Sequence, residues 1–247
     1  MNPQLQAWLF RIFGRERHIS PKDCVHYCGF RYGTSRFNPY QNYIEGLVRG
    51  EDSKTVRQRF VEFLRHYRPE HFGEALGVNL SRKYPLWLYP WGRRSGSGGW
   101  HSMPEECPDV LTHFSRQGIS NKKIEIEFRW LETALTSIQT YGFRPERFNS
   151  FILARKLERV GGDSVYLILD GNHRISVLGT LGIAELPVRY LQISTVYEAD
   201  IEKWPYVRNG TYTREDARLV FQGYFHGNST GRTTDQPAAL SPPTDYL

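Results

Sequence analysis

The chain has few cysteines, few methionines and no long apolar runs. Its 247 residues include three cysteines and two methionines, and the mean hydropathy is −0.55. A small, odd number of cysteines argues against a disulfide framework and favours a reducing compartment. No stretch approaches the ~18 consecutive apolar residues of a membrane-spanning helix, and the N-terminus has no signal-peptide pattern. These absences predict a cytoplasmic protein.

The chain also has no excess of negative charge: its formal net charge is +6. Residues 1–100 hold 16 Lys and Arg against 8 Asp and Glu, whereas residues 101–247 hold 16 against 18. Such an asymmetry is found on faces that bind nucleic acid or anionic membranes, and also on ordinary solvated surfaces. The charge pattern by itself leaves both interpretations open.

Residues 3–15 form an amphipathic helical pattern within the basic half. Leu5, Trp8, Leu9 and Ile12 recur at helical spacing, with arginines close by. Such a helix either docks on its own domain or lies in a membrane interface. In the second case the protein would contact the inner face of the membrane as a peripheral partner.

The most informative segment is residues 165–192. A buried-strand pattern from Val165 to Leu169 runs into Asp-Gly-Asn-His-Arg, and a helical pattern follows until Gly182. A second short strand is predicted from Leu186 to Leu191. The turn therefore lies at the N-terminus of a helix, where unpaired backbone N–H groups attract an anion.

Each residue of this turn suits the handling of a phosphate. Gly171 lets the backbone approach a ligand closely, while His173 and Arg174 are donors suited to phosphate oxygens. Asn172 either contacts a ligand or caps the helix. Asp170, at the carboxyl end of the strand, is placed to hold a metal ion or a hydroxyl group. The pattern predicts a phosphate-binding turn.

The same succession of strand, turn, helix and strand resembles the ParB/sulfiredoxin superfamily. The preceding segment is similar to that family's lead-in helix and turn, with matching residues at Leu131, Leu135, Ser137, Ile138, Gly142 and Pro145. The resemblance covers about residues 121–192. At the turn, Asn172 replaces the cysteine of sulfiredoxins, which argues against sulfinic-acid repair. The D-G-x-x-R pattern is most similar to the free serine kinases of this superfamily.

This resemblance implies a fold, a reaction and a set of residues. The fold would be α+β with a ParB/sulfiredoxin-like core, and ADP or ATP would bind with Mg²⁺ at the turn, where Asp170 would hold the metal. The serine kinases carry a catalytic glutamate before the Ser-Ile helix, and counting back leads to Glu125 or Glu127. Both would face one side of a strand-like segment but would diverge on a helix. Arg129 falls where that branch also has an arginine and would bind the nucleotide, while Asp170 and His173 would complete the catalytic set.

The rest of the chain is predicted to pack around this core. We expect an N-terminal helical, aromatic-rich region over residues 1–120, a helical appendage over 193–225 and a disordered tail over 226–247. The following elements are also expected: a helix over 51–68, an irregular segment over 84–91, a helix over 121–141, paired strands over 148–158 and 165–169, a helix over 214–225, and no regular period over 31–44.

Four arginines of the basic half are candidates for binding the second substrate: Arg31, Arg36, Arg93 and Arg94. Residues 93–99 are rich in glycine, so this stretch is either a loop that closes over a phosphate or a surface linker. The sequence leaves these two interpretations open.

We therefore expect a nucleotide-dependent kinase that phosphorylates a hydroxyl group of an amino acid, a sugar or a glycolipid precursor. The alternative is a nucleotide-switched protein of ParB type that binds DNA or another partner. The lack of a helix-turn-helix pattern downstream of the core disfavours DNA as that partner.

Overall fold

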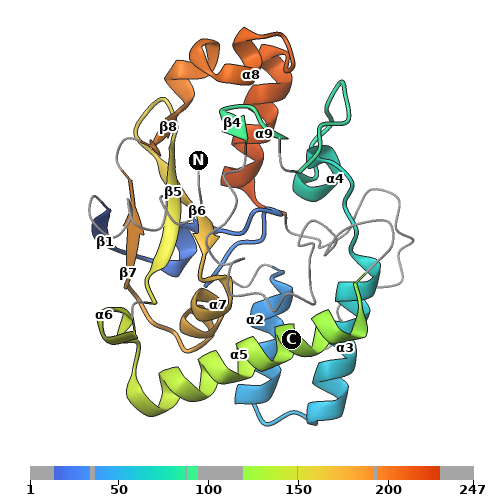
Figure 1. The fold of residues 1–247 in the computed structure, drawn as a ribbon, viewed down its shortest axis with the longest axis vertical. Helices are drawn as coiled ribbons and strands as arrows, with labels where there is room; N and C mark the ends of the chain where they lie inside the picture. Colours follow the sequence, from blue (N-terminus) through green and yellow to red (C-terminus); the bar gives the residue numbers. More distant parts are fainter. Residues whose placement is uncertain are drawn as a thin grey trace, which may run out of the picture.

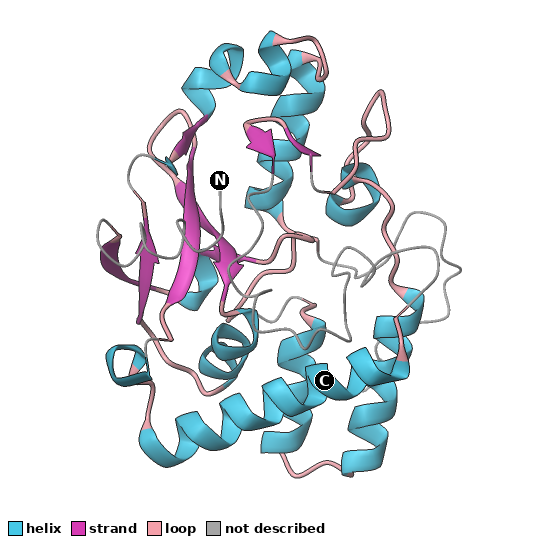
Figure 2. Cartoon of the chain, in the orientation of Figure 1, coloured by secondary structure: helices cyan, strands magenta, loops and turns pink. Residues whose placement is uncertain are grey.

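The chain folds as an α+β protein around one mixed β-sheet (Figures 1 and 2). A computed structural model describes residues 14–33, 37–86, 88–93, 119–148, 150–191 and 194–228. The strand order is β1-β7-β5-β6-β2, and β8 also pairs with β5. The α+β class expected from the sequence is confirmed. Of the helices in these ranges, none is long and apolar enough to cross a membrane.

The centre of the sheet is a β-hairpin formed by β5 (Ile152–Glu158) and β6 (Ser164–Asp170). The two strands are antiparallel, with Arg155 opposite Leu167. The two glycines of their connection have φ of 109° and 95°, a region that is open to glycine and costly for most other residues. The predicted strand pair is confirmed, except that the first strand begins at Ile152 and not at residue 148, which ends the short helix α6 (Pro145–Phe148). The two glycines explain the tight return of the chain.

Strands from distant parts of the chain complete the sheet. β7 (Leu186–Tyr190) is parallel to β5 and antiparallel to β1 (Arg15–Ile19). β2 (Cys24–Val25) is parallel to β6, and β8 (Val196–Tyr197) is parallel to β5. Because β1 and β2 come from the predicted N-terminal region, one sheet unites that region with the predicted core.

The four longest helices begin at clear N-caps. They are α2 (Pro39–Val48) after Asn38, α3 (Ser53–His66) after Asp52, α5 (Asn121–Tyr141) after Ser120 and α9 (Arg214–His226) after Thr213. Each cap side chain accepts a hydrogen bond from a backbone N–H of the first turn, which satisfies a donor that the helix itself leaves free. The helices predicted over 51–68, 121–141 and 214–225 are thereby confirmed as α3, α5 and α9.

Helix α7 (Asn172–Thr180) follows β6 directly. The remaining elements are short. They are η1 (Pro21–Asp23), α4 (Phe72–Leu76), β3 (Leu88–Tyr89), β4 (Gly92–Arg93), α6 (Pro145–Phe148), η5 (Glu198–Lys203) and α8 (Pro205–Arg208). β3 and β4 form a separate two-stranded sheet. In Figure 1, α7 and α5 lie at the lower end of the central strands, while α8 and α9 lie toward the upper end.

The two faces of the sheet bury different kinds of side chain. Along β6, Val165 and Leu167 join a large cluster that is rich in aromatic rings from α2, α3 and α9. Tyr166 and Ile168 point to the other face and join a smaller, more aliphatic cluster that includes residues of α7. Both faces of β6 are therefore covered, which explains why its sequence is continuously apolar instead of alternating.

Predictions for three segments are wrong in part. Residues 31–44 have no clean period, yet α2 begins within them, because Asn38 caps it and proline suits the first helical position. The predicted helix over 3–15 extends too far, because Arg15 is the first residue of β1. Residues 3–13 of that prediction lie outside the described part of the chain. The predicted tail begins too early, because Asn228 is buried and its Nδ2 donates to a backbone carbonyl of α4 at 2.8 Å.

Candidate functional site

The turn after β6 has the predicted strand–turn–helix form. β6 ends at Asp170, Gly171 follows with φ of 94°, and α7 begins at the next residue. A Cβ on Gly171 would lie 2.9 Å from Cγ1 of Ile152, in a left-handed backbone region. Any other residue would be strained and would displace β5. Within the part of the chain that the structure describes, no side chain caps α7, so its first N–H groups face the turn.

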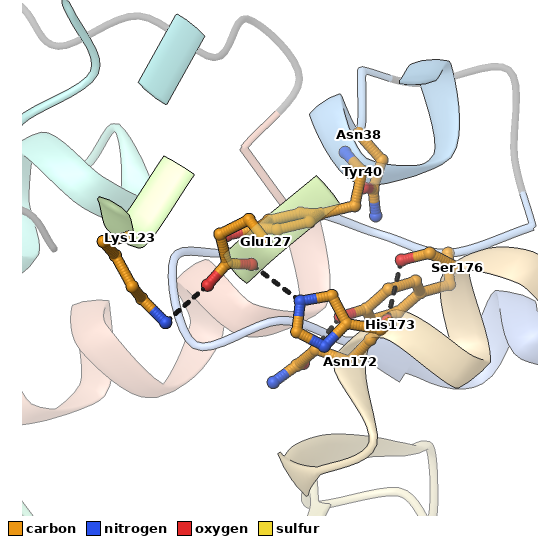
Figure 3. A network of polar contacts seen from close by, with 8 residues as sticks. Asn38, Tyr40, Lys123, Glu127, Asn172, His173 and Ser176 are labelled. Atoms are coloured by element: carbon orange, nitrogen blue, oxygen red, sulfur yellow. Dashed lines mark hydrogen bonds and ion pairs between the residues drawn. The ribbon is translucent and has the colours of Figure 1, made fainter. Parts of the chain in front are cut away.

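His173 points from α7 toward the first turns of α5 (Figure 3). Its Nε2 lies 2.7 Å from Oε2 of Glu127, and Oε1 of Glu127 lies 2.7 Å from Nζ of Lys123. Lys123 and Glu127 are four residues apart on α5, so the helix brings both side chains to one face. Two helices that are distant in sequence thus form one network of ammonium, carboxylate and imidazole groups.

The members of this network differ in their exposure. The side chains of Lys123 and Glu127 are 6% and 5% exposed, whereas that of His173 is 23% exposed. A buried carboxylate needs a compensating cation and hydrogen bonds, which Lys123 and His173 supply. His173 is accordingly the member that a dissolved molecule reaches most easily, and Glu127 lies behind it.

Aromatic rings enclose the network. Trp130 of α5 lies beside His173 with 5.3 Å between ring centroids, and Nζ of Lys123 lies 4.6 Å from the centroid of the same indole. Tyr40 of α2 meets His173 edge-on at 6.0 Å. Burial raises the pKa of Tyr40 well above its ordinary value, and the charge of Glu127 raises this pKa further. Tyr40 therefore keeps its hydroxyl proton beside the carboxylate.

Asn172 fastens α7 to the N-terminal part of the chain. Its Oδ1 accepts a hydrogen bond of 2.7 Å from the buried hydroxyl of Tyr32. Its backbone carbonyl accepts a second one, also of 2.7 Å, from the hydroxyl of Ser176 (Figure 3). The interpretation of Asn172 as the helix cap is wrong, because Gly171 holds that position and Asn172 is the first helical residue. Its amide oxygen positions α7.

Asp170 and Arg174 contact each other across the first turn of α7. Oδ2 of Asp170 lies 3.4 Å from Nη2 of Arg174, and Nη1 of Arg174 donates to the carbonyl of Ser150. Oδ1 of Asp170 accepts from the backbone N–H of Gly171 at 2.7 Å. Both side chains are thus held at the turn by contacts within the protein.

Asp170 is the one carboxylate that the turn itself would offer to a metal ion. Among the described residues, no three His, Cys, Asp or Glu side chains gather to hold a metal. Mg²⁺ is commonly bound by one or two carboxylates together with phosphate oxygens and water. Asp170 therefore fits a magnesium ion that comes with a phosphate ligand, and does not fit a site built from protein side chains alone.

The structure separates the two candidate glutamates. α5 is helical from residue 121 to 141, so Glu125 and Glu127 diverge. Glu125 is 67% exposed, and its Oε2 lies 2.8 Å from Nη2 of Arg57 on α3. Arg129, one turn after Glu125, is exposed on the same side of the helix. The structure thus places Glu127 against His173, and Glu125 and Arg129 on another side of the helix.

Of the four candidate acceptor arginines, the structure describes the side chain of Arg31. Its Nη2 donates to the carbonyl of Lys22 at 2.7 Å, and its Nη1 donates to a carbonyl of α9 at 3.3 Å. These bonds brace the N-terminal loop against α9, which is a structural role. The backbone of Arg93 belongs to β4, whereas Arg36, Arg94 and the glycine-rich stretch after them lie outside the described residues.

Three residues of the network are not among the predicted catalytic, nucleotide-binding or acceptor-binding residues. Lys123 has a detectable signal, because it stands four residues before Glu127 on a predicted helix. Trp130 shares that helix face by its spacing of three residues from Glu127. Tyr40 reaches His173 only through the packing of α2 against α7, for which the sequence holds no local signal.

Comparison of the chain with models of known protein families, with curated proteins and with solved structures finds no match. The function is therefore inferred from the chemistry of the site and from the motif at the turn.

Proposed function

We propose that this protein is a nucleotide-dependent phosphotransferase with a ParB/sulfiredoxin-like core. The observation that carries the proposal is the contact of His173 with the buried Glu127, at the start of the helix that follows the D-G-x-x-R turn. The hairpin of β5 and β6, followed by α7 and β7, supports the proposed core. ADP or ATP would be the phosphate donor, and the acceptor would be a hydroxyl group of an amino acid, a sugar or a glycolipid precursor.

The turn between β6 and α7 would bind the phosphates of the donor. The first N–H groups of α7 lie at the positive end of the helix dipole, and Arg174 adds a fixed positive charge. Arg174 already contacts Asp170 and the carbonyl of Ser150, so its guanidinium is oriented in advance. A Mg²⁺ ion held by Asp170 would neutralise phosphate charge, which is the main requirement of phosphoryl transfer.

His173 would take the proton of the acceptor hydroxyl. Its Nε2 contacts Glu127, so a neutral imidazole with its hydrogen on Nε2 leaves Nδ1 as the proton acceptor. Glu127 would hold that tautomer and stabilise the imidazolium ion that forms, as carboxylates do in other histidine–carboxylate pairs. Because Glu127 is nearly buried behind His173, we assign it a positioning role, with Lys123 balancing its charge.

In the proposed reaction the acceptor oxygen attacks the terminal phosphorus of the nucleotide. A bond forms between this oxygen and phosphorus, the bond from phosphorus to the bridging oxygen breaks, and the hydroxyl proton moves to Nδ1 of His173. The products are the phosphorylated acceptor and a nucleotide that is shorter by one phosphate. Such a transfer depends on positioning and charge neutralisation more than on covalent chemistry.

Phosphate transfer from ADP and ATP, with Mg²⁺, to serine, free sugars and lipid-linked sugars tests this proposal. We expect His173→Asn to lower the turnover by about two to four orders of magnitude, as for a lost general base. Glu127→Gln should lower kcat with little change in either KM, because a positioning residue acts on the step and not on binding. The matched control is His18→Asn, since His18 is an exposed histidine of β1.

Two outcomes would contradict the proposal. Full activity in His173→Asn would place the base elsewhere, and a protein that neither binds nor uses either nucleotide would not be a phosphotransferase of this kind. Nucleotide binding without transfer, together with DNA binding that weakens as salt rises, would instead support the ParB-type alternative.

A further inference from the structure

Trp130 lies beside the proposed base but does not belong to the apolar core. It stands three residues after Glu127 on α5, so the two side chains share one side of the helix. Leu131, the next residue, is fully buried in the aromatic-rich cluster. Trp130 is partly exposed, and among the described residues it is a member of neither core cluster. Packing of the core therefore does not account for a large indole at this position.

The neighbours of the indole are polar groups of the candidate site. The ring centroids of Trp130 and His173 are 5.3 Å apart, with an angle of 59° between the two planes. Nζ of Lys123 lies 4.6 Å from the centroid of the indole. A molecule that brings a hydroxyl group to the imidazole of His173 therefore also comes within reach of the indole.

Lys123 limits the kind of molecule that the indole attracts. The face of an indole attracts cations, and the ammonium group of Lys123 already makes this interaction. The ammonium group of an amino acid therefore gains little from Trp130. A neutral ring with C–H groups on its face still gains dispersion energy and the burial of apolar area. A sugar combines such a face with hydroxyl groups around its edge.

We propose that Trp130 binds the ring of a neutral sugar and that this sugar is the phosphate acceptor. The inference rests on the proposed phosphotransferase function and selects one of its acceptor classes. One face of the sugar would pack on the indole, while a hydroxyl group at the edge would reach Nδ1 of His173. The sugar oxygen forms a bond to the terminal phosphorus, the bond from that phosphorus to the bridging oxygen of the nucleotide breaks, and the hydroxyl proton moves to Nδ1.

A titration without phosphate transfer tests binding at Trp130. The ligands are the methyl glycosides of glucose, galactose, mannose and N-acetylglucosamine, a glucosyl diacylglycerol in detergent micelles, and serine. Each is added with and without a nucleotide analogue that cannot transfer phosphate. The readout is the indole Nε1–H resonance of Trp130, assigned by its absence in Trp130→Phe.

We expect a saturable shift of this resonance with at least one sugar and no shift with serine. A shift with the soluble glycosides would assign a free sugar, and a shift with the glycolipid alone would assign a lipid-linked sugar. A resonance that no sugar shifts, or that serine alone shifts, would overturn the proposal.

Two variants place the sugar in the reaction. Trp130→Ala should raise the KM for the acceptor about tenfold and leave the KM for the nucleotide unchanged, because it removes a surface that only the acceptor contacts. Trp130→Phe should have a smaller effect, since a smaller ring remains. The matched control is Tyr141→Ala, which removes an aromatic ring that is 55% exposed at the other end of α5. An unchanged acceptor KM in Trp130→Ala, or an equal rise of both KM values, would contradict the proposal.

The two measurements separate this inference from the proposed function. A sugar that shifts the Trp130 resonance, without phosphate transfer to any acceptor, would support the sugar site and contradict the phosphotransferase function. Phosphate transfer to serine that Trp130→Ala does not affect would support the phosphotransferase function and overturn the sugar acceptor.

Discussion

Two charged clusters on opposite sides of α5 are alike in composition and differ in burial. On one side Glu127 contacts Lys123 and His173, and on the other Glu125 contacts Arg57. The lysine and arginine pairs have nearly the same lengths, 2.7 Å and 2.8 Å. However, the side chain of Glu127 is 5% exposed and that of Glu125 is 67% exposed.

Burial decides what each cluster is able to do. An exposed ion pair is screened by water and contributes little to stability. A buried pair holds its members in one arrangement, because breaking it leaves a charge without compensation in a poorly polarisable surrounding. The buried cluster is therefore suited to orient His173, whereas the exposed cluster mainly fastens α3 to α5.

The largest expected effect on stability is that of replacing Glu127 by glutamine, and the same replacement of Glu125 is the matched control. Glu127→Gln should lower the free energy of unfolding by about 3–5 kcal/mol, since it removes the buried carboxylate that faces both Lys123 and His173. Glu125→Gln should lower it by less than about 1 kcal/mol. Urea unfolding of both variants measures the difference.

A double variant tests why Glu127→Gln lowers the free energy of unfolding: through the loss of the attraction between Lys123 and Glu127, or through the buried charge that remains. Lys123→Met combined with Glu127→Leu removes both charges and should recover much of the stability lost in Glu127→Gln, because apolar side chains fit a buried site. Equal losses for Glu125→Gln and Glu127→Gln would show that burial does not distinguish the clusters.

Asp216 is a third carboxylate to compare with Glu127 and Glu125. It is buried, and hydroxyl and backbone N–H groups stabilise it. It is 2% exposed and accepts hydrogen bonds from the hydroxyl of Ser81 at 2.5 Å, from the backbone N–H of Ser81 at 2.9 Å and from the hydroxyl of Tyr84 at 2.7 Å. Burial by itself would raise the pKa of Asp216, but these donors outweigh burial and lower it below its ordinary value. The charged form is therefore the one that the folded protein stabilises.

The sign of the resulting pH dependence follows from this lowered pKa. The stabilisation is fully present above the unfolded value of about 3.9 and is lost as the pH falls through the folded value. We expect Asp216→Asn to lower the free energy of unfolding by about 1–3 kcal/mol at neutral pH, with a smaller difference in acid. Urea unfolding across this pH range measures it, and a difference that grows in acid would contradict the assignment.

The smallest effect is expected at the exposed cluster. Arg57→Gln should cost less than about 1 kcal/mol, and about 1 M salt should reduce this cost, because the Debye length is then about 3 Å. Glu127→Gln should keep most of its cost in the same salt, since its network is shielded from ions. If salt does not change the cost of Arg57→Gln, the cost comes from the packing of Arg57 over Phe128 and not from the ion pair. The guanidinium of Arg57 lies 3.9 Å from the centroid of that ring.

The parts of the fold that local sequence predicts are those with local causes. The strand–turn–helix segment around Gly171 is predictable because each residue follows its neighbour in one unit. α2 is harder to predict because its start depends on the single cap Asn38 within an aperiodic stretch. β1 and β2 are not predicted at all, since β2 has two residues and both strands are defined by partners more than 100 positions away.

The candidate site also has one part that local sequence predicts and one part that only tertiary packing decides. The sequence predicts the turn and names both glutamates, and it states that a helix would make them diverge. Only tertiary packing decides which glutamate faces His173, because that choice depends on the side of α5 that meets α7 and not on the residues next to either glutamate.

The sequence by itself determined the α+β class, the hairpin with its glycine turn, and the helix that starts after Asp-Gly. These follow from side-chain periodicity and from backbone conformations that act over a few residues. The tertiary structure alone decided that Lys123 and Glu127 are buried against His173, and that Glu125 is exposed on the other side of the same helix. Burial arises from the meeting of distant segments, so the energetic weight of each charge is fixed only when the chain has folded.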